Sequence, residues 1–69
     1  MSSIEFIRTE IERLRVQISR QQQDILRLQR TGRPTELAEV LLERMRASVE
    51  GLCEKRDGMQ RKSRLAAVN

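Results

Sequence analysis

The chain has 69 residues, of which 38% are hydrophobic and 35% charged, and its formal net charge is +4. This composition is too apolar for a disordered polymer, and one aromatic residue, Phe6, is little for a globular core. With one cysteine and no histidine, an internal disulfide is excluded and a conventional zinc site is disfavoured. We therefore expect one small all-α domain that uses no metal or cofactor.

The first predicted element is a long helix over residues 3–31. Ser2 or Ser3 can cap it, and Ser2 with Glu5 matches the capping-box pattern. An apolar seam runs along this helix in alternating steps of three and four residues. Its positions are Ile4, Ile7, Ile11, Leu14, Ile18, Gln21, Ile25 and Leu28. A heptad seam of this kind predicts a helix that lies against another helix.

A turn over residues 32–35 separates the two halves of the chain. Gly32 is the expected stop of the first helix, Pro34 prevents its continuation, and Thr35 can cap a second helix. The second helix is predicted over residues 35–58 or somewhat beyond. Its seam positions are Ala38, Leu42, Met45, Val49, Leu52, Arg56 and Met59. So short a connection favours antiparallel neighbours, which makes the chain a helical hairpin.

The two seams also predict a register for the hairpin. When they are paired across the turn, the numbers of opposing residues sum to 66 or 67. Ile18 then lies opposite Val49, and Gln21 lies opposite Met45. The two patterns, read independently, mesh along the whole hairpin.

The last part of the chain, residues 59–69, follows Gly58 and is basic. Glycine in a helix interior costs about 1 kcal/mol relative to alanine. We expect the second helix either to fray from Gly58 or to continue to about Leu65, with a mobile end in both cases.

The second helix has a wider apolar stripe than one seam requires, and a broad stripe is typical of a helix with two neighbours. The residues beside the seam form a candidate dimer shoulder, made of Leu26, Leu37, Leu41 and Cys53. We interpret it as the contact with a second copy, which gives a homodimeric four-helix bundle. The alternative is that these side chains thicken the core of one hairpin. A chain this short usually needs a partner, which favours the dimer.

Three single residues allow both a functional and a structural interpretation. Gln21 is the one polar position of the first seam, and it either fixes the register or is tolerated in a loose layer. Cys53 is either a redox-sensitive thiol or a half-buried small hydrophobe, and the second is the commoner role of a free cysteine. Arg56 either binds a ligand, for which no second feature speaks, or lays its stem along Ile11 and reaches Glu12 or solvent with its head.

An arginine stripe on the first helix offers a second hypothesis. Arg13, Arg20 and Arg27 recur every seven residues, and a basic stripe can follow a nucleic-acid backbone. Interspersed acidic residues and the lack of aromatic stacking platforms disfavour this hypothesis. Catalysis has less support still, because no histidine or tyrosine is present and no serine lies beside a base.

Charged residues interrupt the N-terminal segment at Glu5, Arg8, Glu10 and Glu12, and no apolar run reaches the length of a signal-peptide core or a membrane span. A single cysteine suits a reducing compartment. The sequence therefore predicts a cytoplasmic location without membrane contact.

Thr35 and the segments 25–32 (ILRLQRTG), 38–45 (AEVLLERM) and 52–57 (LCEKRD) resemble a group of small bacterial helical-hairpin proteins of unknown function. In architecture alone the chain is also similar to the RNA-binding, Rop-type two-helix dimer, with which it shares no motif. Neither resemblance implies an activity, a substrate or a site residue. We expect a non-enzymatic interaction or regulatory protein that acts as a homodimer, with an unidentified protein partner and no small-molecule substrate. The alternative is a basic RNA- or DNA-binding dimer.

Overall fold

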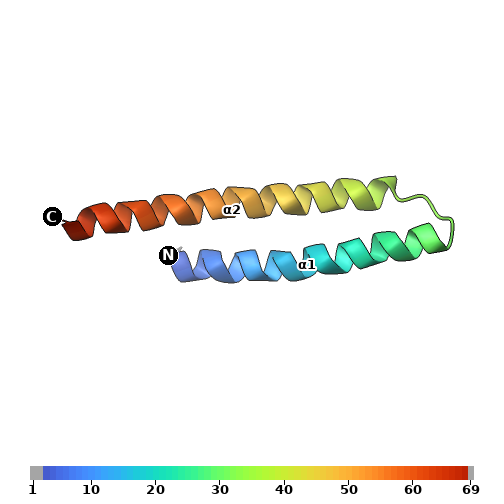
Figure 1. Cartoon of the computed structure of the whole chain (residues 1–69), viewed down its shortest axis with the longest axis horizontal. Helices are drawn as coiled ribbons and strands as arrows, with labels where there is room; N and C mark the ends of the chain where they lie inside the picture. The colour runs from blue at the N-terminus through green and yellow to red at the C-terminus, as the bar shows by residue number, and fades with distance from the viewer. Residues whose placement is uncertain (1–2, 69) are drawn as a thin grey trace.

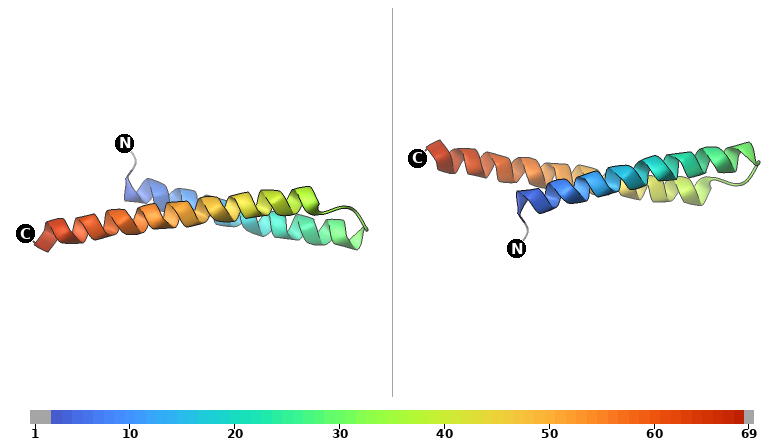
Figure 2. Two further views of the ribbon diagram at one scale, coloured as in Figure 1. Left: turned by 90° about the horizontal axis from the view of Figure 1, so that it is seen from above. Right: turned by 90° about the horizontal axis from the view of Figure 1, so that it is seen from below.

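The computed structural model describes residues 3–68, and within this range it contains two helices, α1 (Ile4–Arg30) and α2 (Glu36–Val68). The helices run side by side in opposite directions and are joined by a short turn (Figure 1). Seen from above and below, they cross at a shallow angle (Figure 2). The molecule measures 60 × 18 × 15 Å. The predicted all-helical hairpin is confirmed.

Helix α1 begins at an N-cap serine, whose side chain accepts a hydrogen bond from a backbone N–H that has no partner within the helix. Ser3 has an extended backbone, and its hydroxyl oxygen accepts a hydrogen bond of 3.2 Å from the N–H of Phe6. Glu5 lies in the first turn, where a negative charge is favourable to the helix dipole. The other proposed cap, Ser2, lies outside the described residues.

Helix α1 ends in a Schellman motif built on a left-handed glycine. Gly32 has φ +68°, which only glycine adopts without a steric cost. The Arg33 N–H donates to the carbonyl of Leu28 at 2.9 Å, and the Gly32 N–H donates to the carbonyl of Gln29 at 3.1 Å. These two bonds satisfy carbonyl groups that the helix end leaves free. Pro34 follows and directs the chain into the turn.

Helix α2 starts after Thr35 and continues further than the sequence predicted. The Thr35 carbonyl accepts the N–H of Glu39 at 2.9 Å, and the Thr35 hydroxyl donates to the Glu39 carboxylate at 3.3 Å. The helix neither frays at Gly58 nor stops near Leu65, because it remains helical to Val68. Residues 59–67 are mostly strong helix formers, which offset the cost of the glycine.

The core of the hairpin is a thin line between the helices. Among the described residues four hydrophobic side chains are buried, with exposed fractions from 1% to 8%: Ile7, Ile11, Ile25 and Leu42. The remaining seam positions are half-buried: Ile4, Leu14, Ile18, Gln21, Leu28, Ala38, Met45, Val49, Leu52, Arg56 and Met59. Residues 61–66 are all exposed, because α2 extends past the start of α1 (Figure 1).

The left-handed conformation of Gly32 generates a first prediction. Replacing Gly32 with alanine should lower the free energy of unfolding by about 1 kcal/mol, because a Cβ atom is disfavoured at positive φ. Urea unfolding followed by circular dichroism, at one protein concentration, measures the change. The Gly32→Asn variant should lose clearly less, since asparagine tolerates this conformation better. Equal losses in the two variants would contradict the assignment of the effect to backbone strain.

Candidate interaction surface at the turn end

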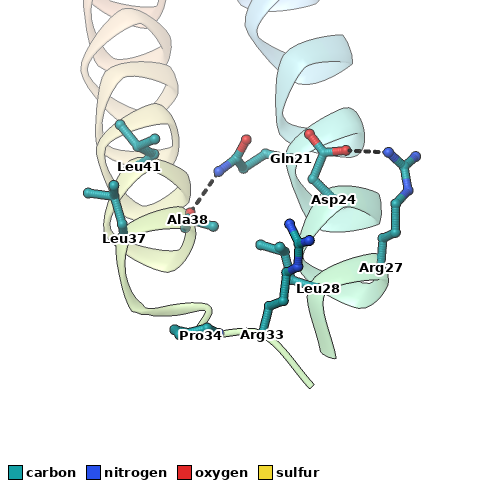
Figure 3. A pocket seen from close by; sticks show the side chains of 9 residues that line it. All are labelled: Gln21, Asp24, Arg27, Leu28, Arg33, Pro34, Leu37, Ala38 and Leu41. Carbon is teal, nitrogen blue, oxygen red and sulfur yellow. Dashed lines mark hydrogen bonds and ion pairs between the residues drawn. The ribbon is translucent and has the colours of Figure 1, made fainter. Parts of the chain in front are cut away.

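The side chain of Gln21 links the two helices near the turn. Its Nε2 donates a hydrogen bond of 2.9 Å to the backbone carbonyl of Ala38, and the bond is partly buried (Figure 3). Gln21 therefore has a specific partner on the other helix. The two heptad seams instead predict that Gln21 lies opposite Met45.

This hydrogen bond corrects the predicted register. Ala38 precedes Met45 by seven residues, which is about 10 Å along a helix. A glutamine side chain cannot span that offset together with the distance between two packed helices, so the pairing of Gln21 with Met45 is wrong. Helix α1 is displaced toward the turn, and its end reaches past the start of α2 (Figure 1).

A groove opens beside this hydrogen bond, between the turn and both helices. It has a volume of about 530 Å³. Its lining residues are Gln21, Asp24, Arg27, Leu28, Arg33, Pro34, Leu37, Ala38 and Leu41. Leu37 and Leu41 form the apolar side on α2, whereas Asp24 and Arg27 form the charged side on α1 (Figure 3). We call this the turn-end groove.

The structure brings together two of the four residues proposed as the dimer shoulder. Leu37 and Leu41 both line the turn-end groove, and their exposed fractions are 75% and 40%. Leu26 is 52% exposed but lines two other grooves, one of which also contains Gln22, Ile25 and Leu42. Cys53 is a free, half-buried thiol more than three turns further along α2 than Leu41.

A second groove on the outer face of α2 was not singled out from the sequence. It is lined by Glu36, Glu39, Val40, Glu43, Arg44 and Ala47. Val40 and Ala47 are seven residues apart and so share one face of the helix. The three carboxylates recur at steps of three and four along the same part of α2. That repeat was the available signal for an acidic, partly apolar surface, which we call the acidic groove.

The arginine stripe is partly neutralised by neighbouring acids. The guanidinium of Arg13 lies 2.8 Å from the Glu10 carboxylate, and that of Arg27 lies 3.6 Å from Asp24. Arg20 makes no ion pair with another described residue. The hydrogen bond from Arg13 and its positive charge lower the pKa of Glu10, and partial desolvation opposes the shift. Two of the three stripe residues thus already have an anionic partner, which weakens their attraction to phosphate.

Within residues 3–68, no group of three or more histidine, cysteine, aspartate or glutamate side chains could hold a metal ion. Neither described helix has a stretch that is both long and apolar enough to cross a membrane.

Comparison with known proteins gives no further assignment. No protein-family model, no curated protein and no solved structure matches the chain.

The interhelix hydrogen bond of Gln21 generates a second prediction. The Gln21→Ala variant should unfold with a free energy about 1 kcal/mol smaller, because it loses a partly buried hydrogen bond and its packing. Urea unfolding measures this change. The neighbouring exposed residue provides a control, since Gln22→Ala should change the free energy of unfolding by less than about 0.5 kcal/mol. Equal effects at the two positions would show that the bond to Ala38 does not stabilise the hairpin.

The contact between Glu10 and Arg13 generates a third prediction. In the Arg13→Ala variant, the pKa of Glu10 should rise toward its ordinary value, because its hydrogen-bond donor is gone. Side-chain carboxyl NMR during a pH titration measures it. Since folding lowers this pKa, the pair stabilises the helix at neutral pH and stops doing so as the pH falls through the lowered pKa. Arg15→Ala, which removes the partner of Glu12, should leave the Glu10 titration unchanged.

Proposed function

We propose that the protein is a small non-enzymatic interaction or regulatory protein that acts as a homodimer, with two hairpins packed into a four-helix bundle. The observation that supports this proposal is apolar surface left uncovered beside a thin core. Seven large hydrophobic side chains are exposed among the described residues: Phe6, Val16, Leu26, Leu37, Val40, Leu41 and Leu65. Three of them, Leu37, Val40 and Leu41, lie within little more than one turn of α2.

The closeness of Leu37, Val40 and Leu41 on α2 supports an interaction site more than the total number of exposed hydrophobic side chains does. Single exposed hydrophobic residues are ordinary on protein surfaces, whereas a contiguous apolar patch marks an interaction site. Burying a leucine side chain contributes about 1.5–3 kcal/mol, so a second copy that covers Leu37 and Leu41 supplies a substantial stabilisation. A chain of this size rarely obtains more than about 3–5 kcal/mol from one core, which makes that contribution important.

A helical dimer also suits the proposed interaction role. Its outer surface consists of helix faces, and helices recognise protein partners by placing apolar side chains in grooves. We place the protein in a reducing compartment such as the cytoplasm, on the basis of its lone free cysteine. Nucleic-acid binding through the arginine stripe has less support, because Arg13 and Arg27 are paired with acids.

This proposal generates a fourth prediction. The protein should sediment as a dimer of 8.1 kDa chains at tens of micromolar, and the Leu37→Asp, Leu41→Asp double variant should sediment as a monomer. Carboxylates at these positions would lose their hydration in the interface, which is unfavourable. Analytical ultracentrifugation measures both states, with circular dichroism to verify helicity.

An apolar residue on α1 provides the control. Val16 is 52% exposed and does not line the turn-end groove, so Val16→Asp should leave the dimer intact. A fully helical wild-type protein that sediments as a monomer would refute the homodimer.

A further inference from the structure

The free end of α2 is basic and has no neighbour in the hairpin. Residues 61–66 are exposed and lie past the start of α1 (Figure 1). They include Arg61, Lys62 and Arg64, and no acidic residue follows Asp57 in the sequence. Leu65 directly follows these three cations and is 68% exposed. The end of α2 therefore presents an apolar side chain next to a group of cations.

The beginning of α2 has the complementary character. The acidic groove contains three carboxylates, those of Glu36, Glu39 and Glu43, around the exposed side chain of Val40. Residues 36–43 contain no basic residue. One helix thus has an acidic, apolar surface at its start and a basic, apolar surface at its end.

A single face of α2 connects these two ends. A helix returns to within about 20° of the same direction every seven residues, so Leu37, Arg44, Gly51, Gly58 and Leu65 lie along one stripe, which winds gradually around α2. All are exposed except Gly58, which is half-buried. Gly51 lies close to the middle of the helix. A Cβ atom added at Gly51 or Gly58 would meet nothing within 4 Å, so packing inside the hairpin does not require either glycine.

We propose that this face binds the same face of a second copy in antiparallel orientation, with Leu65 of each copy beside the acidic groove of the other. This proposal rests on the homodimer proposed above and specifies its contact. Leu37 then lies opposite Leu65 of the second copy, and Arg44 lies opposite Gly58. The two Gly51 residues meet at the two-fold axis, where the absence of side chains allows the helices to approach closely.

Charge determines the orientation. In the antiparallel arrangement, three carboxylates of one copy lie alongside three cations of the other, and symmetry repeats this contact at both ends. A parallel arrangement would place carboxylates beside carboxylates and cations beside cations, which is unfavourable. The contact face also carries a polar side chain that needs no new partner, because the Ser48 hydroxyl already donates to the carbonyl of Arg44 at 3.0 Å.

Charge reversal tests the role of the basic end. The Arg61→Glu, Lys62→Glu variant should raise the dimer dissociation constant about tenfold or more, because each end of the interface would then bring carboxylates together. These exposed residues lie beyond α1, so the hairpin itself should stay folded. The matched control, Arg8→Glu with Arg20→Glu, changes the net charge equally but lies on exposed positions of α1. It should leave the dissociation constant within about twofold.

A second charge variant provides a rescue. The Glu36→Lys, Glu43→Lys variant should also dimerise weakly, and mixing it with the Arg61→Glu, Lys62→Glu variant should restore a heterodimer of wild-type affinity or tighter. Sedimentation of each variant and of the mixture measures this. A mixture that stays as weak as its components would overturn the proposed contact.

Disulfide trapping tests the orientation directly, in a Cys53→Ser background. When Leu37→Cys and Leu65→Cys variants are mixed and oxidised with glutathione disulfide, a cross-linked heterodimer should form. Either variant alone should stay uncross-linked, because identical residues of an antiparallel pair would lie about 40 Å apart. Self-cross-linking of Leu37→Cys would show a parallel arrangement and overturn the proposal.

The central glycine provides a test that is independent of the helix ends. Gly51→Glu should keep or increase helicity, since glutamate is the better helix former and meets nothing in the hairpin. It should nevertheless weaken dimerisation at least tenfold, because two carboxylates would face each other at the axis. The control is Ser19→Glu, which places the same charge at an exposed position of α1 and should leave dimerisation unchanged.

The outcomes separate the two proposals. A wild-type protein that sediments as a monomer refutes the homodimer itself. A stable wild-type dimer that resists Gly51→Glu and gives no mixed disulfide refutes only the antiparallel α2 contact, and leaves the turn-end groove as the dimer surface.

Discussion

The contact of two helices along a single narrow line is the constraint on which the rest of this structure depends. A helix that touches one neighbour can bury one stripe of side chains, and here four residues are buried while the other seam positions are half-covered. Any further apolar residue on either helix must then face outward. The exposure of Leu37 and Leu41 follows from this geometry, because they are on the part of α2 beside the seam. The exposed apolar surface, which we propose as the interaction surface, is thus a consequence of having only two helices.

The ends of the first helix and the hairpin turn could be predicted because they depend on local chemistry. Ser3 supplies its hydroxyl to a nearby N–H, and Gly32 adopts a conformation that other residues avoid. Each of these features depends only on residues within a few positions of it, so it can be predicted without reference to the other helix. The extension of α2 to Val68 could not be predicted from Gly58 alone, because the good helix formers that follow this residue outweigh its unfavourable contribution.

The register could not be predicted in the same way, because a heptad seam repeats. When one helix is shifted along the other by a heptad, apolar positions again lie opposite apolar positions. Isoleucine and leucine fit against one another at several offsets, so the agreement of two patterns does not select one of them. Gln21 is the position that distinguishes the offsets, and its partner is the backbone carbonyl of Ala38. Every residue has such a carbonyl, so side-chain patterns cannot identify the one that is used. For a similar reason Leu26 and Leu37, although both near the turn, line different grooves, because the relative rotation of two helices is a tertiary property.

The distribution of charge along α2 gives a reason for its greater length. Residues 61–66 add no covered surface to the hairpin, and the end of a helix without tertiary contacts is only marginally stable in water. An antiparallel second copy would give this segment both an apolar contact for Leu65 and carboxylates for its three cations. The same contact would cover Leu37, the most exposed of the large hydrophobic side chains described. The basic end of α2 in one copy would then contact the acidic beginning of α2 in the other copy. Within one copy they cannot meet, because they lie at opposite ends of the same helix (Figure 1).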